Sequence, residues 1–184
     1  MIKFTIDDDI ILREFSDGDA AAIYDVVKAN YDHLRSFMWW AKPEYSLVDA
    51  REFIAQGVAD ARQKKSLGFG IFREGKVIGS IGFVKFDSDA KTTEIGYWID
   101  RDEEGKGIIS RACKLLIDYA FNEMKLNRIE IRCSTENVRS AAIPQRFGFV
   151  REGVLRQYAF RNGKLHDFAI YGLLAAEWKA ANPG

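Results

Sequence analysis

The stretch from residue 94 to residue 124 constrains the fold most, because its pattern changes from strand to helix across a glycine-containing turn. Glu94–Ile99 is strand-like, and the apolar residues between 108 and 124 recur with a period near 3.6, which predicts an amphipathic helix. Gly105 and Gly107 lie between the two and tolerate positive φ. Free amides and the helix dipole attract anions at such a helix start. The sequence therefore predicts a backbone anion site near residue 105, although a loop that merely requires glycine has the same pattern.

The spacing of this turn excludes two familiar phosphate-binding motifs. A P-loop requires Gly-x-x-x-x-Gly-Lys-Ser/Thr, whereas Lys106 lies between the two glycines. A dinucleotide-binding turn requires a third glycine at position 110, which is Ser110. An anion loop here must be of another kind.

Length and charge narrow the class of protein. The 184 residues fit one domain spanning 1–184, and the 27 basic and 27 acidic residues cancel. Without a basic excess we expect neither a nucleic-acid binder nor an anionic-membrane binder. We see no signal peptide or membrane span, and Cys113 and Cys133 form no disulfide framework. We therefore expect a soluble, cytoplasmic protein without a metal.

The remaining pattern alternates between strands and helices. The expected strands cover 10–15, 67–72, 76–86, 92–99, 128–134, 154–160 and 164–174, and the expected helices run from 16 or 17 through Val27, 47–64, 108–125 and 140–147. Glu74-Gly75 and Asn162-Gly163 are hairpin-turn signals. A helix joins the strands at 94–99 and 128–134, while hairpins join most others. These connections predict an α/β fold with a mixed, mostly antiparallel sheet.

Several motifs together resemble one known family. They are Gly96-Tyr97-Trp98-Ile99-Asp100, Glu104-Gly105-Lys106-Gly107-Ile108, Asn137 and Gly148-Phe149. The chain resembles the GNAT N-acetyltransferase superfamily, and within it the RimJ/RimL-type branch, which acetylates N-terminal amines of ribosomal proteins. The resemblance extends from Ile11 to Leu174, although Asp102 replaces the usual Gln or Arg of the loop. It implies a twisted sheet with splayed central strands, flanked by helices, and a possible homodimer through the hairpin 154–174.

The resemblance also implies acetyl-coenzyme A as cosubstrate. Its pantetheine arm would lie between the segments 94–99 and 128–134, and its pyrophosphate would meet the loop amides. Gly96 fits a close backbone approach, but packing against a bulky neighbour would also require glycine. Asn137 alone would be read as a turn former. Lys106 and Arg111 would add charge toward the 3′-phosphate. The implied cofactor residues are Ile99, Gly105, Lys106, Gly107, Ile108, Ile109, Ser110, Asn137 and Ser140.

Acetyl transfer requires a neutral amine, and the pKa of the acceptor decides how strong a base is needed. Deprotonation at pH 7 costs about 1 kcal/mol for an α-amine and about 4.6 kcal/mol for a lysine. A weak base therefore suffices for an N-terminal acceptor. Glu94 is the candidate base, because alternation puts it on one strand face with Gly96 and Trp98. A solvated strand-end glutamate is the alternative. His33 and His166 are expected to be surface or structural residues.

The departing thiolate needs a proton donor, and many members of the superfamily use a tyrosine four residues before the Gly-Phe pair. That position is Pro144 here, so Ser140 is the candidate donor, with a helix N-cap as its alternative role. Cys133 matches a cysteine of the ribosomal-protein branch, but we expect a buried, inert thiol and direct transfer. Some members carry a glutamate where Ala159 stands, so the base is Glu94 or water.

The acceptor is less constrained than the cofactor. Tyr31, Trp39 and Trp40 belong to an aromatic stretch that would form one wall of the acceptor groove in the resembled branch, although such rings are also ordinary core residues. The preferred acceptor is a protein N-terminus. A small amine, such as a polyamine, an amino acid or an aminoglycoside, is the alternative. A coenzyme A-binding protein without turnover is a third possibility, suggested by the missing tyrosine.

Overall fold

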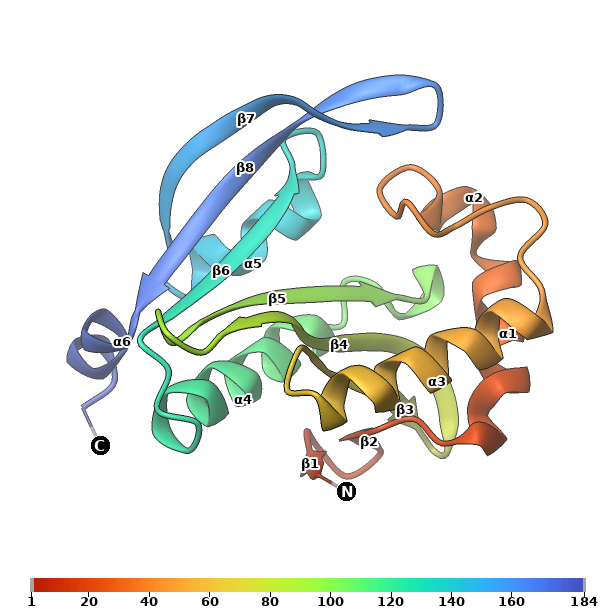
Figure 1. Cartoon of the computed structure of the whole chain (residues 1–184), viewed down its shortest axis with the longest axis horizontal. Coiled ribbons are helices and arrows are strands. Elements are labelled where there is room, and N and C mark those ends of the chain that lie inside the picture. Colours follow the sequence, from red (N-terminus) through yellow and green to blue (C-terminus); the bar gives the residue numbers. More distant parts are fainter. Residues whose placement is uncertain (1, 184) are drawn as a thin grey trace.

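A computed structural model describes residues 2–183 as one eight-stranded sheet with helices on both faces (Figure 1). The strands are β1 (Lys3–Thr5), β2 (Ile10–Arg13), β3 (Leu67–Arg73), β4 (Lys76–Asp87), β5 (Thr92–Ile99), β6 (Arg128–Ser134), β7 (Val150–Arg161) and β8 (Lys164–Leu174). The helices are η1 (Asp17–Asp19), α1 (Ala20–Ala29), α2 (Tyr31–Leu34), α3 (Leu47–Arg62), η2 (Arg101–Glu103), α4 (Ile108–Asn122), α5 (Val138–Arg146) and α6 (Ala175–Ala181). The sheet order is β1-β2-β3-β4-β5-β6-β8-β7.

The centre of the sheet is splayed. Among the strand pairs of residues 2–183, β5 and β6 form the parallel one, and their register ends after Thr92–Arg128, Thr93–Ile129 and Glu94–Glu130. Beyond Glu94 the two strands separate, and β6 swings away from β5 together with β8 and β7 (Figure 1). The predicted mixed, mostly antiparallel sheet with splayed central strands is therefore confirmed.

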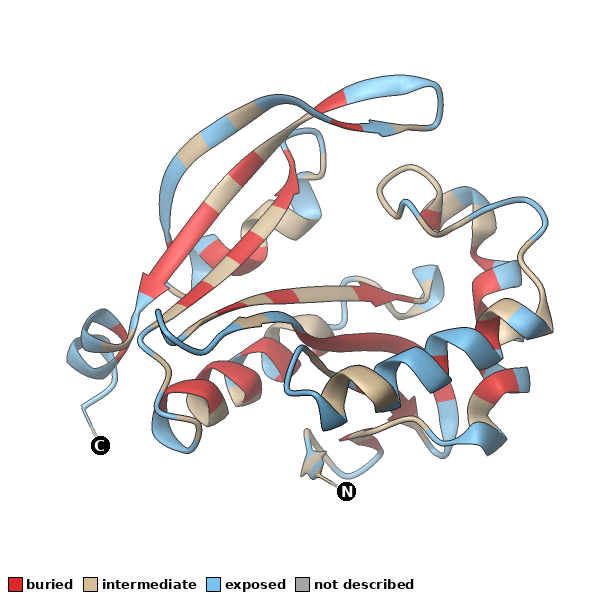
Figure 2. Cartoon of the chain, in the orientation of Figure 1, coloured by how far each residue is buried: buried red, intermediate tan, exposed pale blue. Residues whose placement is uncertain are grey.

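Two cores cover the two faces of the sheet (Figure 2). One core packs the apolar face of α4, including Ala112 and Leu116, against the inward residues of the central strands. The other core packs α1 and α3 against the opposite face, where Trp98 lies. Ile95 joins the α4 core and Trp98 the other core, so the alternation predicted for β5 is confirmed.

Some element boundaries differ from expectation. β2 ends at Arg13 instead of residue 15, and the Phe15 ring packs between Phe53 and Phe72, with ring centres 5.7 and 5.9 Å away. β1 and α6 were not predicted. β7 starts at Val150 and contains a register shift between Leu155 and Ala159. Short edge elements and bulges depend on tertiary contacts that local patterns do not contain.

Candidate functional site

The loop between β5 and α4 has the geometry of an anion site. Gly105 and Gly107 adopt φ of +75° and +71°, and Gly107 is the N-cap of α4. Residues 105–107 are exposed. Within residues 2–183, the backbone amides of residues 105–110 donate to no backbone acceptor. Unpaired amides at an open helix start are the arrangement that binds phosphate groups.

Helix α5 brings two arginines to this loop that the sequence did not reveal. Arg139 contacts the carboxylate of Glu104, which also lies 3.0 Å from Nε2 of His33. Arg146 donates to the hydroxyl of Ser110. Both arginines are about 35 residues away in the chain, so no local motif contains them. Positive charge therefore reaches the loop from across the gap between β5 and β6.

The two cations predicted from the loop itself are paired with other carboxylates. The Lys106 ammonium lies 3.1 Å from Glu103, and Arg111 lies 2.9 Å from Asp7. Arg111 also donates to the carbonyl of Lys106 at 3.1 Å. The charges of Lys106 and Arg111 are consequently compensated by Glu103 and Asp7, which precede the loop in the chain.

Ser140 does not cap its helix. Asn137 is the N-cap of α5, and its side-chain oxygen accepts from the Ser140 amide at 3.0 Å. The suggested N-cap role of Ser140 is therefore wrong, because the helix starts earlier than expected, at Val138. The hydroxyl of Ser140 instead lies 3.1 Å from the hydroxyl of Tyr97. Tyr97 also donates to the Ser140 carbonyl at 3.0 Å.

Cys133 lies on the strand face opposite to Glu130 and Arg132, in the α4 core. Burial raises the pKa of the Cys133 thiol, and a hydrogen bond from Ser140 opposes the shift in part. The thiol is therefore protonated at neutral pH, and a protonated thiol is a poor nucleophile.

Glu94 lies at the point where β5 and β6 separate. Its carboxylate is 3.6 Å from Nε of Arg132, and Arg132 also contacts Glu130 at 2.7 Å. Burial raises the pKa of Glu94, although Arg132 acts in the opposite direction. A Cβ on Gly96 would lie only 2.9 Å from Cγ1 of Val84, so packing against this neighbour by itself favours glycine here.

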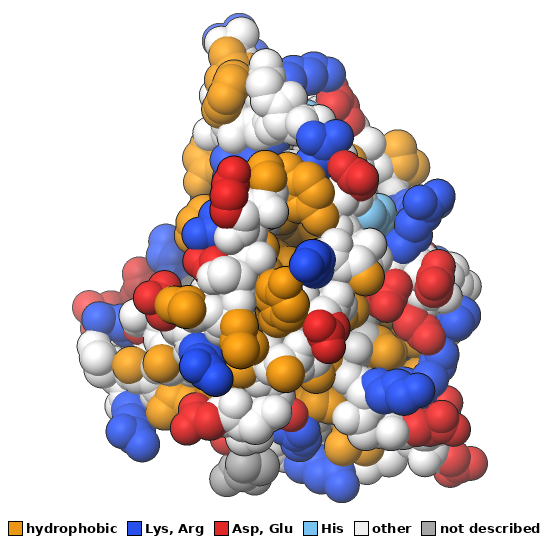
Figure 3. All heavy atoms as spheres, turned by 90° about the vertical axis from the view of Figure 1, so that its right-hand side faces the viewer, with side chains coloured by type: hydrophobic (Ala, Val, Ile, Leu, Met, Phe, Trp, Pro, Cys, Tyr) orange, Lys and Arg blue, Asp and Glu red, His pale blue; other side chains and the backbone are white. Residues whose placement is uncertain are grey.

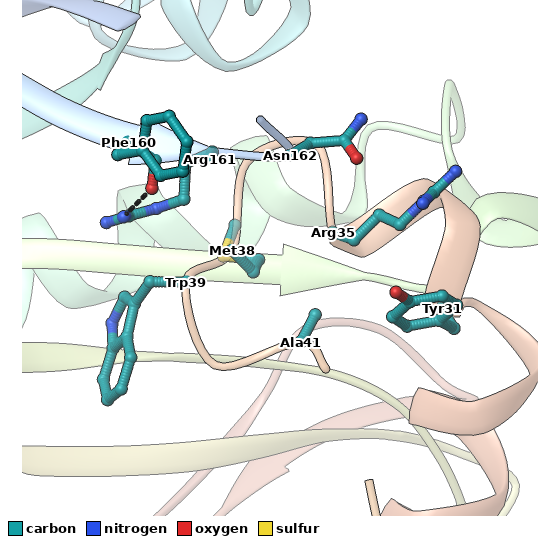
Figure 4. A pocket seen from close by; sticks show the side chains of 8 residues that line it. All are labelled: Tyr31, Arg35, Met38, Trp39, Ala41, Phe160, Arg161 and Asn162. Carbon is teal, nitrogen blue, oxygen red and sulfur yellow. Dashed lines mark hydrogen bonds between the residues drawn. The ribbon is translucent and has the colours of Figure 1, made fainter. Parts of the chain in front are cut away.

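A pocket of about 210 Å³ opens between the α2 segment and the tip of the β7–β8 hairpin (Figure 4). Its lining residues are Tyr31, Arg35, Met38, Trp39, Ala41, Phe160, Arg161 and Asn162. Trp40 is not among them, since its ring packs against that of Trp98 with centres 5.7 Å apart. The pocket belongs to a face on which hydrophobic side chains gather among charges of both signs (Figure 3). The hairpin contribution was not foreseen.

His166 and Ala159 are cross-strand partners in the β7–β8 hairpin. His166 is buried, with Nδ1 at 3.4 Å from both the Ser134 hydroxyl and a Glu136 carboxylate oxygen. These contacts link the hairpin to the end of β6, which is a structural role.

Within residues 2–183, no group of three or more His, Cys, Asp or Glu side chains could hold a metal ion. In the same range, every helix is too short or too polar to cross a membrane.

Comparisons with known proteins agree on one family. Residues 9–150 match the model of the acetyltransferase (GNAT) domain. The protein YdaF of Bacillus subtilis, provisionally named a ribosomal N-acetyltransferase, is 34% identical over 97% of this chain and 98% of its own. The ribosomal-protein-serine acetyltransferase of Escherichia coli is 30% identical over 90% of this chain and 93% of its own.

Solved structures show the same relationship. A crystal structure described as "Probable acetyltransferase" is 33% identical, has a TM-score of 0.91, and covers 96% of this chain and 99% of its own. The microcin C7 self-immunity acetyltransferase MccE, solved with acetyl-CoA and AMP, is 30% identical with a TM-score of 0.85. That match covers 92% of this chain and 94% of the MccE chain.

Proposed function

Since the chain belongs to the GNAT acetyltransferase family and is an N-acetyltransferase, we propose that it acetylates the N-terminal α-amine of a protein, with ribosomal proteins as the first candidates. Two relatives at 30% identity or more carry names that refer to ribosomal acceptors, which supports this choice of substrate. The observation that carries the proposal is the splayed sheet that ends in an open amide loop.

Acetyl-coenzyme A fits the two halves of this site. Its pyrophosphate would be held by the amides of Gly105, Lys106, Gly107, Ile108, Ile109 and Ser110, with charge from Arg139 and Arg146. Its pantetheine amides would pair with the backbone of β5 up to Ile99, where β6 no longer does. Asn137 would act indirectly, by capping the helix that carries Ser140.

The reaction is a direct displacement at the thioester carbonyl. The amine nitrogen forms the new C–N bond, the C–S bond breaks, and the proton lost by the amine ends on the coenzyme A sulfur. The Ser140 hydroxyl would donate a hydrogen bond to the departing thiolate, and Glu94 would accept the amine proton through water. The protonated Cys133 thiol supports direct transfer over an acyl-cysteine intermediate.

The pocket at the hairpin tip supports a peptide acceptor over a polyamine. It contains two guanidinium groups, Arg35 and Arg161, beside the rings of Tyr31, Trp39 and Phe160. Arg35 is paired with Asp32 at 3.1 Å, whereas Arg161 donates to the Phe160 carbonyl, so the Arg161 charge would repel cationic amines such as polyamines and aminoglycosides. An extended peptide could instead lay its main chain and an apolar or acidic side chain against them.

The test combines thiol release from acetyl-coenzyme A with mass spectrometry. The acceptor panel contains ribosomal-protein N-terminal peptides, the same peptides with blocked N-termini, spermidine, amino acids and an aminoglycoside. We expect thiol release and an added acetyl group only with free peptide N-termini. Release with spermidine alone would favour the small-amine alternative. Binding of coenzyme A without release from any amine would favour a protein without turnover.

Self-association is part of the same proposal. β7 is an edge strand of the sheet and exposes Val150, Val154 and Phe160, a pattern that suits pairing with a second copy. Light scattering at micromolar concentration should report twice the mass of one chain. The Val154→Lys variant should instead have the mass of a single chain. A cytoplasmic location is also expected, since Cys113 and Cys133 are free thiols.

A further inference from the structure

The hydroxyl of Tyr97 crosses the gap in the sheet. Tyr97 belongs to β5, which has separated from β6 at this height, and Ser140 belongs to α5, which follows β6. The Tyr97 hydroxyl lies 3.0 Å from the carbonyl oxygen of Ser140 and 3.1 Å from its hydroxyl oxygen. The Tyr97 phenol therefore contacts two atoms of Ser140, the residue that would donate a hydrogen bond to the departing thiolate in the proposed function.

The sequence of α5 explains why the Ser140 carbonyl accepts this bond. In an α-helix the carbonyl of residue i accepts from the amide of residue i+4, which for Ser140 is Pro144. Proline has no N–H, so the helix leaves this carbonyl without its donor. Tyr97 supplies the donor from another element, and an unpaired carbonyl in a partly buried position would be costly.

Because the phenol has a single proton, its bond to the carbonyl determines the other contact. While Tyr97 donates to the Ser140 carbonyl, its oxygen can only accept from the Ser140 hydroxyl, so before the reaction the single Ser140 proton points at Tyr97 and must turn to the sulfur as the thiolate leaves. Burial raises the pKa of Tyr97 well above its usual range, which keeps the phenol protonated and makes it a poor proton source. A role in orientation therefore fits better than a role as proton donor.

From these contacts we propose that Tyr97 is a positioning residue for Ser140. It holds the first turn of α5 against β5 through the carbonyl, and it fixes the position of the Ser140 hydroxyl oxygen, whose proton would turn from Tyr97 to the coenzyme A sulfur as the thiolate leaves. The inference rests on the proposed acetyl transfer, in which Ser140 is the residue that contacts the leaving group.

The test is a double-mutant cycle on kcat with Tyr97→Phe and Ser140→Ala. Tyr97→Phe should lower kcat about tenfold with the coenzyme A affinity retained, and by less than about twofold when Ser140 is already alanine. Tyr119→Phe is the matched control, because Tyr119 packs its ring in the α4 core and should leave kcat unchanged. An equal loss in both backgrounds, or no loss in either, would overturn the assignment.

A second cycle uses stability and needs no acetyl transfer. Pro144→Ala supplies the missing amide to the Ser140 carbonyl, so Tyr97→Phe should lower Tm by less than half as much in that background as in the wild type. An equal Tm shift in both backgrounds contradicts the carbonyl bond. Absence of turnover in the wild type with every acceptor would refute the proposed function, and this cycle would then decide alone whether the contact exists.

Discussion

Glu94 faces Arg132 across the point where β5 and β6 separate, with 3.6 Å between a carboxylate oxygen and the guanidinium Nε. Glu94 is opposite Glu130 in the last parallel pair of the register, so its side chain marks the closed end of the splay. Arg132 also contacts Glu130 at 2.7 Å, and this second ion pair restrains the position of the guanidinium group beside Glu94. A carboxylate that could assist an amine is thus held at the base of the gap between β5 and β6, where the proposed function places the pantetheine arm.

Replacing this carboxylate should change the pH dependence of turnover. Burial raises the pKa of Glu94. As the pH falls, the wild type should therefore protonate this base, and lose activity, at a higher pH than an ordinary glutamate would. Glu94→Gln should lower kcat about tenfold below the pKa of the acceptor amine and much less above it, where the amine is already neutral. A pH–rate profile supplies the measurement. Glu123→Gln, an exposed change at the end of α4, is the control, and identical profiles for Glu94→Gln and wild type would remove Glu94 from the mechanism.

The loop glycine should be required for its backbone conformation. Gly105 has φ of +75°, and a Cβ there would meet no atom within 4 Å, so Gly105→Ala adds strain without a clash. The strain of about 1–2 kcal/mol should turn the loop amides and weaken coenzyme A binding about tenfold in calorimetry. Gly75→Ala introduces the same kind of strain, at φ of +81°, in the β3–β4 turn. Equal affinities of the two variants would contradict a role for the loop conformation.

Glu104 should oppose cofactor binding. Its carboxylate lies beside the amide loop and occupies Arg139, so it competes with a phosphate for that guanidinium. Glu104→Gln should tighten coenzyme A binding by about 1 kcal/mol, or roughly fivefold, at low salt. The gain should shrink in 0.5 M salt because of screening. Asp102→Asn removes an exposed charge from the same loop, and an equal gain there would show that the pairing with Arg139 is irrelevant.

Trp39 should affect the acceptor and not the cofactor. Its side chain lines the pocket at the hairpin tip while remaining 74% exposed, so its removal should not disturb the core. Trp39→Ala should raise KM for a peptide acceptor about fivefold, at unchanged coenzyme A affinity and unchanged Tm. Val48→Ala, an exposed change in α3, is the control. A loss of coenzyme A affinity in the Trp39 variant would contradict the assignment of this pocket to the acceptor.

The ion pair between Arg13 and Asp19, 2.7 Å apart, should make the stability of the fold depend on pH. Hydrogen bonds from Arg13 lower the pKa of Asp19 to about 2, against 3.8 when unperturbed. A lowered pKa stabilises the fold above the unfolded value, and this stability is lost as pH falls from about 4 toward 2. Asp19→Asn should therefore reduce the free energy of unfolding by about 1–2 kcal/mol at pH 7 and by almost nothing near pH 2. Urea titrations of this variant and of Asp17→Asn, an exposed neighbour, would show whether the difference follows pH.

Local sequence predicted most of the regular elements because hydrophobic period and turn residues are local properties. The strands at 92–99, 128–134 and 164–174 were predicted with the bounds that the structure has. Asn162 and Gly163 both adopt positive φ, as their hairpin signal requires. The start of α5 was misplaced by two residues because Asn137, and not Ser140, accepts the capping hydrogen bond. Trp40 could not be separated from Trp39 by pattern, since only packing against Trp98 distinguishes the two rings.

The order of residues by itself determined a strand, a glycine turn and a helix around residue 105, and with them the position of the open amide loop that we propose as the anion site. Such a motif needs only neighbours in the chain, because φ preferences and helix periodicity act over a few residues. Tertiary structure decided which distant groups meet that motif: Arg139 and Arg146 at the loop, Arg132 at Glu94, and Tyr97 at Ser140. These contacts join residues about 35 or more positions apart, and they exist only because the sheet brings β5 beside β6 and then separates them.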